Sequence, residues 1–83
     1  MKPLTVDYIK SLGFKKTDTT VEEDFYYEDW DYLGSEIALT VFITYWKNGK
    51  ITFDVDLDGC SLVNVGQFEL KTLIKILPNE NAY

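Results

Sequence analysis

The stretch DVDLDG at residues 54–59 holds the side chains whose types and spacing most clearly suggest chemistry. Three acids and a glycine match positions one, three, five and six of an EF-hand calcium loop: Asp54, Asp56, Asp58 and Gly59. Position twelve of that loop is a bidentate glutamate, and in this chain it is Val65. A weak calcium-binding module at residues 54–58 is therefore one interpretation of the pattern.

The same stretch also fits the solvent-facing side of an ordinary strand. Alternate residues of a strand share one face and stand about 6.6–6.8 Å apart, whereas calcium ligands lie about 2.3–2.6 Å from the ion. Phe53, Val55 and Leu57 would form the buried side of this strand, with the aspartates in water. We favour the strand, and we expect neither a metal nor another cofactor.

The composition argues against several kinds of activity. The chain has no histidine and no arginine, and its 14 acids and 8 bases give a net charge of −6. It therefore lacks the commonest general base and the bidentate phosphate clamp, and only Cys60 offers a thiolate for zinc. The negative net charge also repels phosphate backbones. We expect no enzymatic activity and no direct nucleic-acid binding.

The sequence also bears on where the protein resides. No apolar run approaches the roughly 18 residues that a membrane span needs. The opening stretch MKPLTVDYIKSLGF lacks the apolar segment of a secretory signal, and the single Cys60 cannot form an internal disulfide. We therefore expect a cytoplasmic protein that does not bind membranes.

Apolar periodicity predicts two helices around three strands. The first helix is expected to follow Thr5 as N-cap and stop at Gly13, and the last to follow Asn64 as N-cap and stop at Pro78. The expected strands cover residues 22–32, 36–47 and 50–57. Residues 15–21, KKTDTTV, are polar and are expected to form a loop.

The register of the second hairpin follows from matching its two faces. A two-residue loop would pair Ile43 with Asp54 and mix acids with apolar side chains. A three-residue loop, residues 47–49, pairs Ile43 with Phe53 and makes one face uniformly apolar. A type I turn closed by a left-handed glycine, Gly49, has this geometry, so we choose the three-residue loop.

These elements predict an α+β fold with the order α-β-β-β-α. An antiparallel three- to four-stranded meander with two helices packed on one face buries every apolar stripe. We expect a single domain over residues 1–78 and a frayed tail at residues 79–83. The topology is similar to that of the double-stranded-RNA-binding domain, although the basic residues with which that family grips phosphates have no counterpart here.

Two short patterns carry a second resemblance. Residues 4–14 read L-x-x-x-Y-I-x-x-L-G-F, and residues 70–77 read L-x-x-L-I-x-x-L. Both patterns resemble the helix ends of small proteins from Bacteroides-type gut bacteria and their phages. The resemblance covers about a quarter of the chain, implies no activity and assigns no residue a role.

We expect the sheet face that the helices leave uncovered to bind a partner. The register places Phe42 and Trp46 on that face, and the strand at residues 22–32 adds Trp30 or Tyr27, of which we select Trp30. Clustered exposed rings often mark protein interfaces. The expected partner-binding residues are therefore three aromatic anchors and three acids that select a basic partner: Trp30, Phe42, Trp46, Asp54, Asp56 and Asp58.

A run of acids extends this surface. Seven acids and no base lie between Glu22 and Glu36. A continuous negative surface could compete with nucleic acid for a basic groove on another protein, as small acidic phage inhibitors do, and the chain resembles those inhibitors in size and charge. The alternatives are a homodimer formed through the same face, rings covered by the tail or a loop, and an ordinary solvated acidic face.

Overall fold

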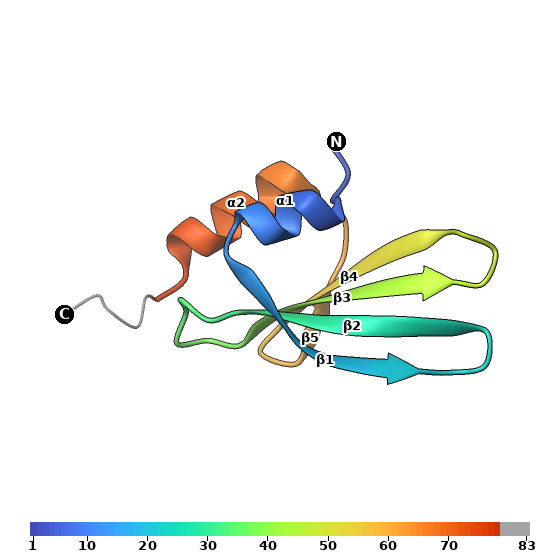
Figure 1. Cartoon of the computed structure of the whole chain (residues 1–83). Helices are drawn as coiled ribbons and strands as arrows, with labels where there is room; N and C mark the ends of the chain where they lie inside the picture. Colours follow the sequence, from blue (N-terminus) through green and yellow to red (C-terminus); the bar gives the residue numbers. More distant parts are fainter. Residues whose placement is uncertain (79–83) are drawn as a thin grey trace.

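The computed structural model describes residues 1–78 and shows an α+β fold, as predicted (Figure 1). Its elements in chain order are α1 (Val6–Ser11), β1 (Phe14–Val21), β2 (Phe25–Tyr32), β3 (Leu39–Trp46), β4 (Ile51–Leu57), β5 (Cys60–Leu62) and α2 (Gln67–Ile76). The strands form one antiparallel meander in the order β1-β2-β3-β4-β5. The tail predicted at residues 79–83 lies outside the described residues.

The predicted register of the β3–β4 hairpin is confirmed. Tyr45 lies opposite Ile51, and Ile43 lies opposite Phe53, as the three-residue loop requires. Trp46 N–H donates to the carbonyl of Lys50 at 2.8 Å, and Gly49 has a positive φ of 90°. A glycine is favoured at this position because a side chain rarely adopts that conformation.

The sheet has more strands than the sequence indicated. Residues 15–21 belong to β1, so the loop expected there is wrong. β1 pairs with β2 from Phe14 opposite Tyr32 to Val21 opposite Tyr26. An edge strand pairs on one side only, so a segment as polar as this one can form a strand. Its lysines and the shift in register discourage pairing with another chain along the free side. β5 adds a short strand on the opposite edge.

Both helices pack on one face at one end of the sheet (Figure 1). Ile9 of α1 and Leu70 of α2 are fully buried against Val41 and Ile43 of β3. The two hairpin tips, residues 22–24 and 47–50, extend away from the helices (Figure 1). The opposite face of the sheet has no helix over it within residues 1–78, and this is the face that the sequence predicted to be open.

The helix ends follow the sequence at α1 and differ from it at α2. Tyr8 N–H donates to Thr5 Oγ1 at 3.1 Å, which confirms Thr5 as N-cap. The N-cap of α2 is Gly66 and not Asn64, because the start of the helix docks on the N-terminal segment. Gln67 N–H donates to the carbonyl of Lys2 at 2.9 Å. Neither helix within residues 1–78 has the length and apolar character needed to cross a membrane.

Gly66→Ala is expected to lower the free energy of unfolding by about 1–3 kcal/mol. A methyl group at this position would lie 2.6 Å from the Lys2 carbonyl oxygen and 2.5 Å from Met1 Cγ, so the N-terminal segment would have to shift. Urea unfolding measures the loss. Thr72→Ala, at an exposed position of α2, is the control and should change stability little. Equal stability of Gly66→Ala and wild type would show that the N-terminal segment does not pack on α2.

Candidate functional site

The sheet face turned away from the helices carries rings and carboxylates in cross-strand rows. We call it the open face, and on the three central strands it consists of Phe25, Tyr27, Asp29, Asp31, Thr40, Phe42, Thr44, Trp46, Thr52, Asp54 and Asp56. The outer strands add Lys15 and Asp18 of β1 and Ser61 of β5. Its rows follow from the register, in which Asp29 lies opposite Phe42, and Phe42 lies opposite Asp54. Since side chains alternate along each strand, all these residues point to the same side.

One half of the open face is an interlocked aromatic cluster. The rings of Phe25 and Trp46 have centroids 5.0 Å apart, and Phe25 stacks on Tyr27 at 6.4 Å. Tyr27 in turn meets Phe42 edge-on at 6.2 Å. Trp46 is 40% exposed, and its Nε1–H donates to Thr52 Oγ1 at 2.9 Å. The rings are thus held in place before any partner arrives, which lowers the entropy cost of binding.

The other half is acidic, and two of its carboxylates have defined orientations. Asp31 Oδ1 accepts a hydrogen bond from Thr40 Oγ1 at 2.6 Å, and Asp31 Oδ2 accepts one from Thr17 Oγ1 at 3.0 Å. Asp56 Oδ1 accepts a hydrogen bond from Ser61 Oγ at 3.2 Å. Hydroxyl groups orient these carboxylates without neutralising them.

A third carboxylate, that of Asp29, lies where its charged form is disfavoured. Its Oδ1 is buried without a hydrogen-bond partner among the described residues. Burial, followed by the negative charges of Asp18 and Asp31, raises the pKa of Asp29 above its ordinary value. The ion pair found in the described part of the chain, Lys16 Nζ to Glu28 Oε2 at 3.6 Å, lies on the opposite face. Charge on the open face is therefore not balanced by an internal ion pair within residues 1–78.

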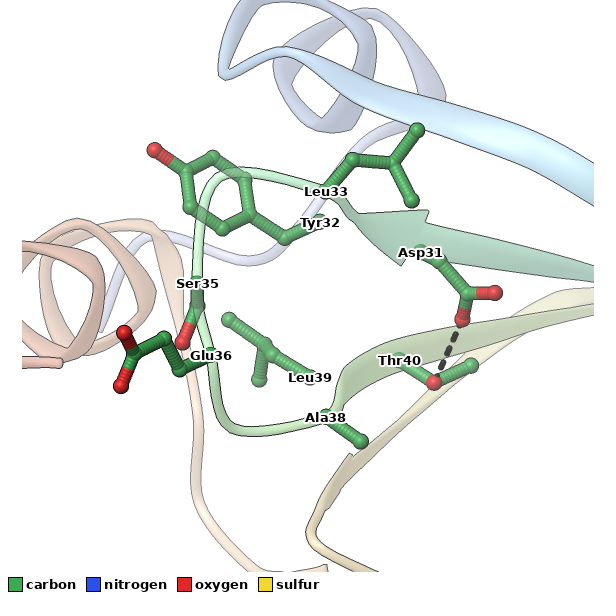
Figure 2. Close-up of a pocket in the computed structure, with 8 residues that line it drawn as sticks. All are labelled: Asp31, Tyr32, Leu33, Ser35, Glu36, Ala38, Leu39 and Thr40. Atoms are coloured by element: carbon green, nitrogen blue, oxygen red, sulfur yellow. Dashed lines mark hydrogen bonds between the residues drawn. The ribbon is translucent and has the colours of Figure 1, made fainter. Parts of the chain in front are cut away.

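A shallow hollow of about 350 Å³ lies where the two halves meet. Four strands line it with two rings, two carboxylates and two hydroxyls: Tyr27, Phe42, Thr44, Asp54, Asp56 and Ser61. A different hollow, of about 290 Å³, lies at the corner between β2 and β3 (Figure 2). Asp31 borders it but turns its carboxylate towards Thr40 (Figure 2). A further hollow, of about 260 Å³, lies at the hairpin tips and also combines rings with acids, among them Phe25, Trp46 and Glu23. The hollow on the open face differs from it in that both of its carboxylates stand on one regular strand, β4.

The structure places most of the predicted partner-binding residues on the open face. Phe42, Trp46, Asp54 and Asp56 lie there as expected. Asp58 lies just beyond the end of β4, in the turn that leads to β5, with a positive φ of 52°. It therefore borders the open face and does not continue its rows.

The expectation that Trp30 lies on the open face is wrong. Trp30 is opposite Val41, so it shares the helix-covered face and is only 8% exposed. Its Nε1–H donates to Glu28 Oε1 at 3.0 Å, and Lys10 Nζ lies 5.8 Å from the ring centroid. Tyr27 takes the place assigned to Trp30, because it has the opposite parity along β2.

Glu28 is the centre of a polar cluster on the helix-covered face. In addition to Trp30, the Tyr45 hydroxyl donates to Glu28 Oε1 at 3.1 Å. The Tyr45 ring stacks on Tyr26 with centroids 4.7 Å apart. Burial, the hydrogen bond to Glu28 and its negative charge raise the pKa of Tyr45 to about 12. These contacts connect β1, β2 and β3 through one side chain, so we interpret the cluster as structural.

Sequence reasoning missed Phe25, Asp29 and Asp31 on the open face, and it weighed Tyr27 but selected Trp30 instead. The signal was present, since these four residues of the open face alternate along one strand. The seven-acid run obscured it, because acids on both faces of β2 read as one charged segment. The face to which the alternating set belongs depends on how β2 pairs with β3.

The aspartates of β4 do not form an EF-hand loop. Asp54 and Asp56 lie within a regular strand, and the element after Asp58 is the strand β5. An EF-hand places its loop between two helices. Within residues 1–78, no group of three or more histidine, cysteine, aspartate or glutamate side chains is arranged to hold a metal ion.

Compared with protein-family models, curated proteins and solved structures, the chain matches none of them. The class of protein is therefore defined by geometry alone. It is a small α+β domain whose sheet has one helix-covered face and one face of rings and acids.

Asp29→Asn is expected to raise the free energy of unfolding at pH 7 by about 1 kcal/mol, because it removes a negative charge whose buried oxygen, Oδ1, has no hydrogen-bond partner among residues 1–78. The pKa of Asp29 is raised on folding, so its ionisation destabilises the fold as the pH rises through the raised value. The extra stability of Asp29→Asn over wild type should disappear in acid, as the pH falls towards the ordinary aspartate pKa of 3.8. Urea unfolding at pH 7 and in acid tests this. Glu23→Gln, at the exposed hairpin tip, is the control. A less stable Asp29→Asn at pH 7 would contradict the argument.

Tyr45→Phe is expected to remove a pH-dependent part of the stability. The pKa of Tyr45 is about 12 in the folded protein and near 10 in the unfolded chain. The stability that the protonated Tyr45 hydroxyl contributes is therefore complete below about pH 10, and it is lost as the pH rises through about 12. Relative to Tyr45→Phe, the wild type should lose about 1–2 kcal/mol over that range. Urea unfolding of both proteins at pH 8 and pH 11 measures the difference. Parallel pH courses would contradict a donated hydrogen bond from Tyr45 to Glu28.

Proposed function

We propose that this chain is a non-enzymatic protein-interaction module whose open face binds a positively charged surface of another protein. One observation carries the proposal: on a sheet face that no helix of residues 1–78 covers, carboxylates without an ion pair among those residues lie beside an interlocked aromatic cluster. Rings supply contact area in protein interfaces, and charges of one sign select and steer the partner.

The carboxylates are close enough for their fields to add. Neighbouring acids on one strand stand about 6.6–6.8 Å apart, which is within the Debye length of about 8 Å at physiological salt. Lys15 lies on the open face opposite Asp31, and Lys50 borders it at the hairpin turn, but neither forms an ion pair with its aspartates in the described part of the chain. The acids on the face outnumber these bases. The face should therefore attract cations and repel anions.

Self-association through the open face is the less favourable alternative. In a twofold dimer the same patch meets itself. Aspartates from three strands would then face aspartates of the second copy, and like charges at close range oppose such packing. A foreign basic partner satisfies both the rings and the acids.

More specifically, we propose that the partner carries a basic groove that normally binds nucleic acid. Rows of carboxylates on a rigid sheet would then compete with phosphates for that groove, as an inhibitor from a phage or mobile element would. We propose the cytoplasm as the compartment, because the single cysteine, Cys60, is exposed and free.

The test is affinity purification with the tagged chain, followed by binding measurements on the captured partner. Trp46→Ala should weaken binding about tenfold or more, because it removes a preorganised anchor. Raising the salt from 50 to 200 mM should weaken binding further by slowing association. Ile76→Ala is the matched control, since Ile76 is an exposed apolar residue of α2 and is 72% exposed.

Binding that responds to neither salt nor Trp46→Ala would contradict the proposal. Capture of the chain by itself alone, with a dimer seen in sedimentation, would favour the homodimer instead. Near-equal effects of Trp46→Ala and Ile76→Ala would show that the open face is not the binding surface.

A further inference from the structure

The hollow on the open face has a shape and chemistry that suit one kind of side chain. Tyr27 of β2 and Phe42 of β3 form its apolar wall, and Asp54 and Asp56 of β4 form its acidic wall. We propose that this hollow receives an arginine side chain of the partner protein. This inference rests on the proposed function and specifies which group of the partner the open face recognises.

The acidic wall can accept hydrogen bonds. Asp56 uses Oδ1 to accept the hydroxyl of Ser61, which leaves Oδ2 available. Asp54 is exposed and receives no hydrogen bond from residues 1–78. Each carboxylate can therefore accept N–H groups from outside, and hydrogen bonds between charged groups are about twice as strong as neutral ones.

The apolar wall can hold a flat cation. Tyr27 and Phe42 meet at an interplanar angle of 76°, so the face of one ring is turned to the edge of the other. A cation is attracted to a ring face when it lies within about 6 Å of the centroid. The other face of the sheet already contains such a contact, between Lys10 and the ring of Trp30 at 5.8 Å.

A guanidinium group can use both walls at once. It is planar, so it can stack on a ring while the N–H groups at its edge point to the carboxylates. The ammonium group of lysine is a compact, strongly hydrated charge, and it cannot stack. The hollow should therefore bind arginine more tightly than lysine. A surface that carries acids but no rings would not distinguish the two in this way.

The inferred source of this arginine is another protein. None of the 83 residues is an arginine, so a second copy of this sequence cannot supply the guanidinium group. This argument separates the inference from the homodimer alternative, because self-association would leave the hollow without its preferred occupant.

The experiment is an NMR titration of the full chain with three short peptides that are identical except at one central position. That position is arginine, lysine or citrulline, the uncharged analogue of arginine. The arginine peptide should shift the amide signals of Tyr27, Phe42, Asp54 and Asp56 in a saturable way. The lysine peptide should bind at least about threefold more weakly, and the citrulline peptide should leave these signals unchanged.

Two double variants with the same change in charge locate the site. Asp54→Asn with Asp56→Asn should weaken binding of the arginine peptide about tenfold. Glu22→Gln with Glu23→Gln, in the separate hollow at the hairpin tips, should leave its affinity unchanged, because the inference places the arginine between β2, β3 and β4. Phe42→Leu, which keeps an apolar side chain without a π face, should reduce the preference for arginine over lysine. The spectra also report whether each variant is folded.

Equal binding of the arginine and lysine peptides would overturn the inference, as would shifts spread over all acidic residues. Equal effects of the two double variants would overturn it as well. These results leave the proposed function to its own test, because a basic partner could still bind through Trp46 in a salt-dependent way. If the peptide results hold but the captured partner ignores Trp46→Ala, the hollow is an arginine site and the broader interface is wrong.

Discussion

The register of the β3–β4 hairpin is the constraint on which the rest of the structure depends. Because the loop has three residues, Val41 lies opposite Val55 and Phe42 lies opposite Asp54. The first pair enters the core beneath the helices, and the second forms part of the open face. A slip of one residue would exchange the faces of a whole strand. It would bury the aspartates of β4 under the helices and remove the acidic wall of the hollow on the open face.

The open face concentrates features that do not favour stability. One carboxylate oxygen of Asp29 is buried without a hydrogen-bond partner among residues 1–78, and burial and two nearby aspartates raise the pKa of this group. On the helix-covered face, in contrast, Glu28 accepts hydrogen bonds from Trp30 and Tyr45 and pairs with Lys16. Local conflicts of this kind tend to concentrate at functional sites. The contrast between the two faces is therefore physical support for an interaction at the open one.

In the proposed interaction, the two halves of the open face have complementary roles in binding a cation. The interlocked rings are positioned by one another, so little conformational entropy is lost when a partner covers them. The acids supply long-range attraction, and Thr40 and Ser61 orient two of them without removing their charge. Rings and acids both line the hollow between the halves. In the proposed interaction, the open face as a whole prefers basic partners, and the hollow prefers an arginine side chain.

The sequence by itself determined the features that depend on short stretches of chain. The cap at Thr5, the turn at Gly49 and the alternation along β4 all follow from residues within a few positions of one another. The strand at residues 15–21, the face of Trp30 and the placing of Asp29 and Asp54 on either side of Phe42 were decided only by the tertiary structure. Each of these requires β2 to choose a partner and a register across the connection at residues 33–38. No local pattern specifies that choice, because its energy comes from burying one side of the finished sheet beneath the helices.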